Sequence, residues 1–171
     1  MSSPIRLRAL TMHDAAVTWK WRNQEDVRNE FSGHPFPINE ELEREWFQKN
    51  IHSNFPTTIF GVELIASEEL VGMTFLKNIH MIHRNAEFAI LVDSRHSGKG
   101  YGKAACRATL EFAFRNLGLH RVYLKVKKTN AAAISIYESC GFKKEGVLRE
   151  DVFKNAEFAD QLVMGILAQE F

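Results

Sequence analysis

The sequence has no long hydrophobic run and almost no excess of one charge. No segment approaches the roughly twenty apolar residues that a membrane-spanning helix needs, and residues 1–6 carry no apolar signal region. With 22 Lys and Arg against 21 Asp and Glu, the formal net charge is +1. A near-neutral chain has no global field that attracts a polyanion. We therefore expect no membrane segment and no nucleic-acid partner, and any anion site must be local.

Cysteine is also scarce, and the histidines do not form a metal-binding pattern. The two cysteines, Cys106 and Cys140, fall in expected helices and belong to no metal-type pair. We expect both to be buried free thiols in a protein of the reducing cytoplasm. His80 and His83 lie three residues apart with no third ligand nearby. No metal site is therefore expected.

The 171 residues, 45% of them hydrophobic, suit a single domain spanning residues 1–171. Hydrophobic periodicity predicts a first strand from Ile5 to Leu10 and three helices over residues 12–23, 26–31 and 39–51. In the first helix we expect Ala15, Ala16, Val17 and Trp19 to face inward. β-Branched and aromatic residues then predict three antiparallel strands at 57–66, 70–79 and 85–92. A helix to Asn116, a strand at 122–126, a helix at 130–140 and a strand pair at 142–153 and 158–167 complete the chain. The expected class is α/β, of the α+β type, with a mixed and mostly antiparallel sheet covered by helices on both faces.

A glycine-rich turn joins the third of these strands to a helix. Gly98, Gly100 and Gly102 alternate with larger residues, and Lys99 and Lys103 add positive charge. Glycines let backbone N–H groups approach an anion, and a helix N-terminus adds unpaired donors. The spacing matches neither the P-loop nor the dinucleotide fingerprint. The turn therefore predicts a phosphate cradle, with a glycine turn that binds nothing as the alternative.

Three segments in order resemble the motifs of one enzyme family. Residues 84–90 look like its fourth strand, residues 97–102 look like its pyrophosphate loop, and in residues 130–142 an Asn opens a helix and a Tyr precedes a Gly-Phe corner. Together they resemble the GNAT superfamily of acetyl-CoA-dependent N-acetyltransferases. The resemblance implies a GNAT-like fold in which a splayed strand pair holds acetyl-CoA. It assigns residues 57–167 to the cofactor-binding core and leaves residues 1–56 as a variable acceptor-side section.

The resemblance also implies a set of residues for acetyl-CoA. The end of the fourth strand would bond the pantetheine arm through its backbone, and Asn130 would contact the same arm. The family loop usually begins with Gln or Arg where this chain has Ser97, and Arg95 is a candidate phosphate ligand that compensates. The predicted cofactor-binding residues are Ile90, Leu91, Val92, Arg95, Ser97, Gly98, Lys99, Gly100, Tyr101, Gly102, Lys103, Asn130, Ala133 and Tyr137.

Two residues are candidates for the chemistry of direct amine acetylation. Tyr137 follows Asn130 by seven residues, about two helical turns, so both project from one face. A phenol, with a reference pKa near 10, can give a proton to the departing thiolate; the alternative for Tyr137 is a core aromatic. Glu87 can take the ammonium proton directly or through water. The alternative for Glu87 is a strand-surface acid that pairs with Arg84 or Lys77.

The acceptor has several alternatives. Residues 78–88 resemble the corresponding stretch of bacterial spermidine N-acetyltransferases, which implies a small-molecule amine such as spermidine, bound by N-terminal carboxylates. The candidates are Glu30 and Glu41, together with Glu40, Glu43 and Glu45; a solvated helix face is the alternative.

Residues 19–23 instead resemble a branch that acetylates amino-sugar nucleotides or the N-termini of ribosomal proteins. In that case Trp21 would stack on a sugar or base and Arg22 would meet a phosphate; a buried Trp21 is the alternative. A non-catalytic acetyl-CoA sensor is the alternative of a different class. An exposed final strand would allow a homodimer.

Overall fold

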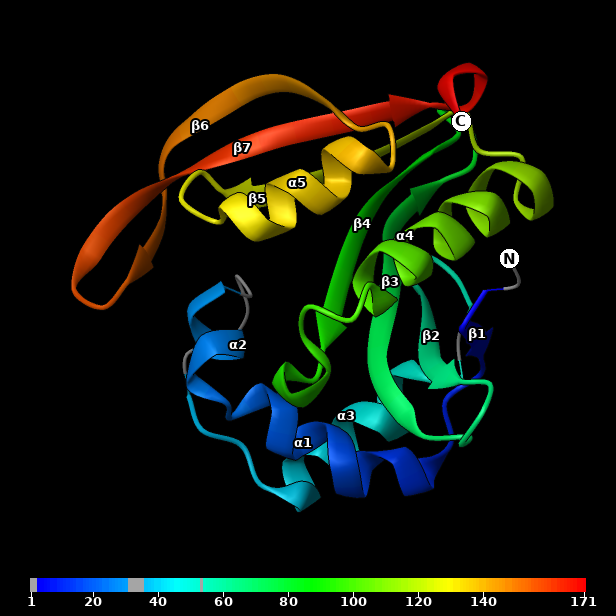
Figure 1. Cartoon of the computed structure of the whole chain (residues 1–171), viewed down its shortest axis with the longest axis vertical. Helices are drawn as coiled ribbons and strands as arrows, with labels where there is room; N and C mark the ends of the chain where they lie inside the picture. The colour runs from blue at the N-terminus through cyan, green and yellow to red at the C-terminus, as the bar shows by residue number, and fades with distance from the viewer. Residues whose placement is uncertain (1–2, 31–35, 53) are drawn as a thin grey trace.

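A computed structural model describes residues 3–30, 36–52 and 54–171, without the side chains of Asn29 and Glu30. Seven strands form one sheet in the order β1-β2-β3-β4-β5-β7-β6 (Figure 1). Only the β4–β5 pair is parallel among the described strand pairs. This confirms the mixed, mostly antiparallel sheet. The strands are β1 (Ile5–Arg8), β2 (Thr58–Leu64), β3 (Leu70–His80), β4 (Asn85–Val92), β5 (Arg121–Lys127), β6 (Lys143–Lys154) and β7 (Glu157–Leu167).

Helices cover both faces of the sheet, as predicted. On one face, Trp21 and Phe47 pack against Met73, Phe75 and Leu91 of the central strands. On the other face, helices α4 and α5 bury their apolar sides over strands β1 to β5 and β7. The helices are α1 (Ala15–Arg22), α2 (Glu25–Glu30), α3 (Glu40–Asn50), α4 (Tyr101–Glu111) and α5 (Ala131–Ser139), with 3₁₀ turns η1 (Met12–Asp14), η2 (Ser94–His96) and η4 (Ala168–Glu170) and a π-helical turn η3 (Phe112–Asn116).

The first helix differs from the prediction. It begins at Ala15 and ends at Arg22, and the buried positions are Ala15, Thr18 and Trp21, which recur every three residues. Val17, which we expected to face inward, is 37% exposed. Sequence reasoning favoured the aliphatic side chain, but the Thr18 hydroxyl is satisfied inside the protein by Glu43, at 2.7 Å. The helix expected over residues 26–31 is α2, and residue 31 lies outside the described residues.

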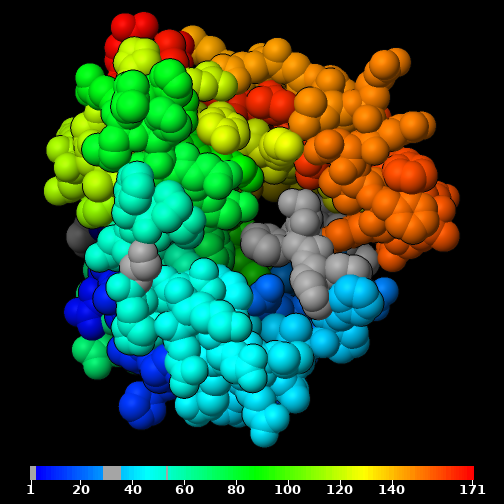
Figure 2. All heavy atoms as spheres, turned by 180° about the vertical axis from the view of Figure 1, so that it is seen from behind, coloured from blue at the N-terminus to red at the C-terminus, as the bar shows by residue number. Residues whose placement is uncertain are grey.

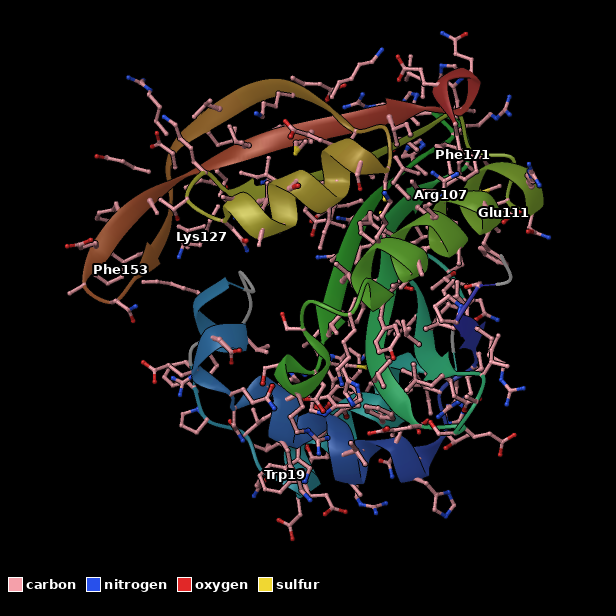
Figure 3. All side chains as sticks on the ribbon, in the orientation of Figure 1. Trp19, Arg107, Glu111, Lys127, Phe153 and Phe171 are labelled. Atoms are coloured by element: carbon pink, nitrogen blue, oxygen red, sulfur yellow. The ribbon has the colours of Figure 1, made fainter. Side chains whose placement is uncertain are left out.

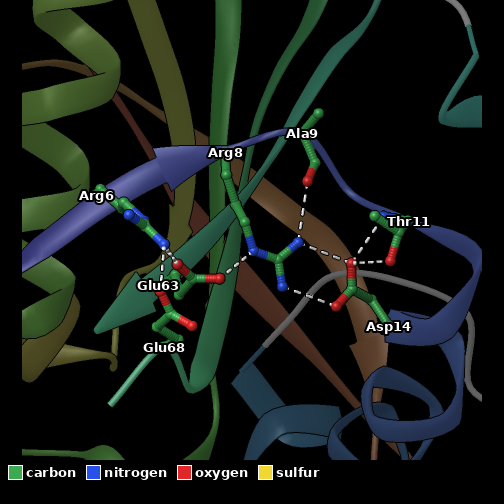
Figure 4. Close-up of polar contacts among 7 residues, drawn as sticks. All are labelled: Arg6, Arg8, Ala9, Thr11, Asp14, Glu63 and Glu68. Carbon is green, nitrogen blue, oxygen red and sulfur yellow. Dashed lines mark hydrogen bonds and ion pairs between the residues drawn. The ribbon is translucent and has the colours of Figure 1, made fainter. Parts of the chain in front are cut away.

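An ion-pair network fixes β1 to β2 and to the start of α1 (Figure 4). The Arg8 guanidinium donates to both oxygens of Asp14 at 2.8 Å and also to Glu63, which Arg6 contacts at 2.6 Å. The Thr11 N–H donates to Asp14 at 2.7 Å and caps the turn η1 that leads into α1. Burial alone would raise the pKa of Asp14 and of Glu63. The hydrogen bonds and charge of Arg8, together with Thr11 at Asp14 and Arg6 at Glu63, more than offset it, so both pKa values lie below their ordinary range.

The parallel strands β4 and β5 separate part-way along their length. Their backbones pair only at Asn85↔Arg121, Ala86↔Val122 and Glu87↔Tyr123, although β4 continues to Val92 and β5 to Lys127. Beyond Glu87 and Tyr123, the edge of β4 that faces β5 has no ladder partner there. This confirms the predicted splayed strand pair. Cys106 and Cys140 are both free and buried, as expected.

The β6–β7 hairpin lies at the rim of the fold. The β6–β7 hairpin extends away from the main body, and Phe153 lies at its tip (Figures 1 and 3). Seen from behind, the atoms of this hairpin form the orange and red upper right of the molecule, and α3 lies in the cyan region below (Figure 2). Phe153 and Phe158 are 61% and 64% exposed, with ring centroids 4.9 Å apart. The hairpin therefore presents an aromatic pair to solvent.

Candidate active site

A cavity of about 400 Å³ fills the space between the splayed strands. Phe88 to Val92 of β4 form one wall, and Lys125 and Val126 of β5 form the other. Because β4 has left its parallel partner here, the N–H and C=O groups on this edge are available to a ligand. The remaining lining residues are Asp26, Val27, Lys77, Glu87, Ser97, Asn130, Ala132, Ala133 and Tyr137.

The glycine turn forms a second cavity, of about 440 Å³, at the end of the first. Gly98 and Gly100 have φ of +75° and +81°, and a Cβ at either would meet nothing within 4 Å. The turn therefore uses a left-handed backbone and leaves open space beside it, as a cradle for an anion requires. Val92 and Ser97 line both cavities, so the two adjoin. The other lining residues are His96, Gly98, Gly100, Tyr101, Gly102, Lys103, Ser135, Ile136 and Ser139.

Helix α4 begins at Tyr101 with Gly100 as its N-cap, one residue before the expected start at Gly102. The Arg95 guanidinium donates to Asp93 at 2.8 and 2.5 Å and is otherwise exposed. Lys99 is exposed, and neither cation lines a cavity described above. A phosphate contact for Arg95 and Lys99 therefore stays a prediction.

Tyr137 lies inside α5 and reaches the first cavity. Its ring packs edge-on against Phe88 and Phe142, with centroids 6.2 and 5.8 Å away. Its hydroxyl has no hydrogen-bond partner among the residues that the structure describes. Burial, with a smaller contribution from Cys106 and Cys140, raises the pKa of Tyr137 well above its ordinary value. The phenol is thus protonated at neutral pH and has a proton to give.

Asn130 and Tyr137 share one face of α5, as the spacing predicted. Asn130 is the N-cap of the helix, and its Oδ1 accepts the Ala133 N–H at 3.0 Å. This bond leaves the amide NH₂ of Asn130 for another partner. Both side chains line the cavity between β4 and β5.

Glu87 lies at the point where β4 and β5 part. Its carboxylate is 3.3 Å from Lys77 Nζ and accepts a 3.3 Å hydrogen bond from Asn78. Arg84, the other expected partner, donates instead to the Gly118 carbonyl at 2.7 Å. Glu87 therefore both lines the cavity and forms the ion pair with Lys77. Its role as a base stays a prediction.

A third cavity, of about 260 Å³, opens on the side of helices α1 and α3. It shares Lys77 and Leu91 with the cavity between the splayed strands. The two spaces therefore meet at the middle of the sheet, on β3 and β4. The lining residues are Arg22, Trp46, Asn50, Thr57, Ile59, Met73, Phe75, Lys77 and Leu91. We call this space the acceptor cavity, because Arg22, Trp46 and Asn50 come from residues 1–56, the section expected to bind the acceptor.

The predicted acceptor residues are only partly brought together. Arg22 lines the acceptor cavity. Trp21 is 1% exposed within the core, so its predicted stacking on a substrate is wrong. It completes the inward stripe of α1, as Ala15 and Thr18 do. Glu41 is exposed on α3 and lines none of the three cavities, and the side chain of Glu30 lies outside the described residues.

The other predicted carboxylates are also away from the acceptor cavity. Glu40 pairs with Arg44 on the surface, Glu45 is exposed, and Glu43 is buried against Arg22. Sequence reasoning missed Trp46, Asn50 and Thr57 as lining residues. No local signal marks them, because they come from α3 and from the edge of β2 and converge only in the folded sheet.

Two structural findings concern metals and membranes. Within residues 3–30, 36–52 and 54–171, no three His, Cys, Asp or Glu side chains gather in a way that could hold a metal ion. Over the same part of the chain, no helix is both long enough and apolar enough to cross a membrane.

Known proteins match this chain over nearly its full length. A family model for the acetyltransferase (GNAT) domain matches residues 5–143. The spermidine N(1)-acetyltransferase of Vibrio cholerae is 36% identical over 171 residues, which cover 100% of this chain and 97% of the relative. The crystal structure of the Vibrio cholerae spermidine N-acetyltransferase in complex with CoA and spermine superposes with a TM-score of 0.91 at 33% identity and covers 99% of this chain and 98% of that one. A dodecameric structure of the Vibrio cholerae enzyme gives a TM-score of 0.83 at 34% identity, with coverage of 98% and 96%.

Proposed function

This chain belongs to the GNAT acetyltransferase family, and from that premise we propose that it transfers the acetyl group of acetyl-CoA to a primary amine. The observation that carries the proposal is the meeting of two cavities at Lys77 and Leu91. One cavity runs along the unpaired edge of β4 and adjoins the glycine turn, and the other opens on the side of helices α1 and α3. A donor and an acceptor entering from the two sides would meet beside β4, as direct transfer requires.

We call the cavity between the splayed strands, together with the adjoining cavity at the glycine turn, the donor cavity. Its residues fit acetyl-CoA. The unpaired edge of β4 at residues 88–92 would bond the amides of the pantetheine arm. The open backbone at Gly98 and Gly100, together with the N-terminus of α4, would hold the pyrophosphate. Ser97 lies where the two cavities join and would contact the phosphates.

The transfer itself needs two proton movements. The neutral amine nitrogen attacks the thioester carbonyl, the C–N bond forms, and the C–S bond breaks. Tyr137 would give its phenolic proton to the departing thiolate, and Glu87 would take the proton that the amine loses, directly or through water. Binding both reactants in a fixed geometry supplies much of the acceleration.

Polyamines are the first acceptors to test, because the matched Vibrio cholerae relative is named for spermidine. The experiment is CoA-thiol release from acetyl-CoA with spermidine, spermine, an amino-sugar nucleotide and a short peptide as separate acceptors. Turnover of any amine supports the proposal. If acetyl-CoA raised the melting temperature but no amine were turned over, the non-catalytic sensor would be favoured.

The organisation of the chain follows the same division. Arg22, Trp46 and Asn50 bring residues 1–56 into the acceptor cavity, in support of that section as the acceptor side. The two buried free thiols support a reducing cytoplasm as the place of action. One solved relative is dodecameric, and Phe153 and Phe158 of this chain are exposed. Light scattering should therefore test for an assembly larger than the predicted homodimer.

A further inference from the structure

A buried carboxylate fixes Arg22 at the wall of the acceptor cavity. Glu43, whose side chain is 0% exposed, accepts Nη1 of Arg22 at 3.0 Å. Its other oxygen accepts the Thr18 hydroxyl at 2.7 Å. The guanidinium also lies over the Trp46 ring, 5.5 Å from its centroid. One edge and one face of the guanidinium are thereby held, so its orientation is set before any ligand arrives.

The rest of this guanidinium is available to a ligand. An arginine side chain carries several N–H donors in a planar fork, and Arg22 uses one nitrogen on Glu43. No other hydrogen-bond partner of Arg22 occurs in the described part of the chain. Its side chain is 23% exposed and lines the cavity. Free donors of this kind suit the two oxygens of a carboxylate or phosphate.

The remaining lining of the acceptor cavity has no carboxylate. Its second cation is Lys77, which also faces the donor cavity and is paired there with Glu87 at 3.3 Å. The other lining residues are apolar, aromatic or neutral polar. A polyamine would bring additional ammonium groups into this space, whose own described lining offers no opposite charge. The carboxylates of the adjoining cavity are Asp26 and Glu87, and Glu87 is already paired with Lys77. Burying such a charge unpaired is costly.

Resting on the acetyl transfer proposed above, we propose that the acceptor is a primary amine that carries an anionic group, a carboxylate or a phosphate, bound by Arg22. The amine would reach β4 near Lys77 and Leu91, and the chain between the two groups would lie against Trp46 and Phe75. Glu43 acts as a positioning residue, since it contacts the Arg22 guanidinium and not the cavity. A buried ion pair contributes little net stability. We therefore attribute the presence of Glu43 to its orientation of Arg22.

The test uses amines of matched length. The ω-amino acids from 3-aminopropanoate to 6-aminohexanoate are compared with the n-alkylamine and the α,ω-diamine of equal chain length, together with spermidine. O-phosphoethanolamine and 3-aminopropyl phosphate form the phosphate arm. We expect kcat/KM for the best anionic amine to exceed that of its matched alkylamine and diamine at least tenfold. The better arm identifies the anion as carboxylate or phosphate.

Variants connect the preference to Arg22. The variants are Arg22→Gln and the double variant Arg22→Gln/Glu43→Gln, which leaves no buried charge unpaired. In both, the ratio of kcat/KM for the anionic amine to kcat/KM for its matched alkylamine should fall to about 1. Arg44→Gln, which removes an exposed arginine of α3 paired with Glu40, should keep the wild-type ratio. A folded variant that kept the preference would overturn the assignment.

Different results would exclude the anionic acceptor and the proposed acetyl transfer. If spermidine or the diamines were the better acceptors, acetyl transfer would stand and the anionic acceptor would be excluded. If no amine were turned over and acetyl-CoA did not raise the melting temperature, the proposed function itself would be lost, and this inference with it.

Discussion

The side-chain amide of Gln24 is hydrogen-bonded to the buried carboxylate of Asp93, with Nε2 3.1 Å from Oδ1. The same amide accepts the backbone N–H of Ser94 at 3.3 Å. Gln24 follows α1, and Asp93 follows β4 directly before the glycine turn. Burial would raise the pKa of Asp93, but hydrogen bonds from Arg95 and Gln24 outweigh it and lower that pKa. One glutamine thus joins the acceptor-side helices to the loop of the donor cavity.

Removing this link should affect both stability and donor binding. In Gln24→Leu, the buried Asp93 loses a donor, so the free energy of unfolding should fall by about 1–3 kcal/mol. The KM for acetyl-CoA should rise because the turn at Ser94 is less firmly held. Urea unfolding and steady-state kinetics measure the two effects. Gln48→Leu, at an exposed site of α3, is the control. A loss of stability with unchanged KM would make the link purely structural.

Tyr137→Phe should separate chemistry from packing. The ring contacts with Phe88 and Phe142 remain, and the lost hydroxyl has no partner among the described residues, so stability should change by less than about 0.5 kcal/mol. If the phenol is the acid, kcat should fall roughly 10²-fold. Tyr123→Phe removes a hydroxyl on β5 that lines none of the three cavities and should keep the rate. Full activity in Tyr137→Phe would remove Tyr137 from the mechanism.

Glu87→Gln tests the base. An amide cannot take the ammonium proton, so kcat/KM should fall by about 10- to 100-fold, and the acidic limb of the pH–rate profile should flatten. Glu138→Gln removes an exposed carboxylate paired with Lys144 and should leave the profile unchanged. An unaltered acidic limb in Glu87→Gln would assign proton acceptance to water alone.

The ion-pair network of Arg8 predicts a loss of stability in acid. The folded-state pKa values of Asp14 and Glu63 lie below their ordinary values, so the unfolded chain binds protons first as the pH falls. Their contribution is complete above the unfolded pKa values near 4 and is lost as the pH falls through the folded values. Arg8→Met should cost about 2–3 kcal/mol at pH 7 and flatten the decline in stability below pH 5.

Urea unfolding at pH 7, 5 and 3 measures this dependence. Arg115→Met breaks an exposed pair with Glu111 and should change stability by less than about 0.5 kcal/mol at every pH. Equal pH slopes in wild type and Arg8→Met would contradict the role of the network.

Local chemistry made much of this structure predictable. The strand predicted at 85–92 has the same bounds in the structure, because its apolar run from Phe88 to Val92 ends at Asp93, where the polar turn begins. The caps at Asn39 and Asn130 follow from side chains that accept a backbone N–H three residues on. The glycine turn was recognisable because Gly98 and Gly100 require a left-handed backbone.

What sequence reasoning missed depends on contacts between distant segments. Arg95 is held by Asp93, two residues away, and Asp93 is itself fixed by Gln24 from another part of the chain. Trp21 is buried because it lies on the face of α1 that packs against Phe47 and the central strands. The acceptor cavity draws on two helices and three strands. No spacing rule along the chain could assemble it.

The place of β7 in the sheet determines when the donor cavity can be completed during biosynthesis. β7 pairs with β5 from Arg121↔Leu167 to Lys127↔Gln161, and it is the last strand to be made. The last β7 residue that pairs with β5, Leu167, follows Lys127 by 40 positions (167 − 127), which translation covers in roughly 2–8 s. Until then β5 is held only by its short pairing with β4, and its other edge is open to wrong partners. A nascent chain that has not yet reached the end of β7 therefore has no finished wall for acetyl-CoA.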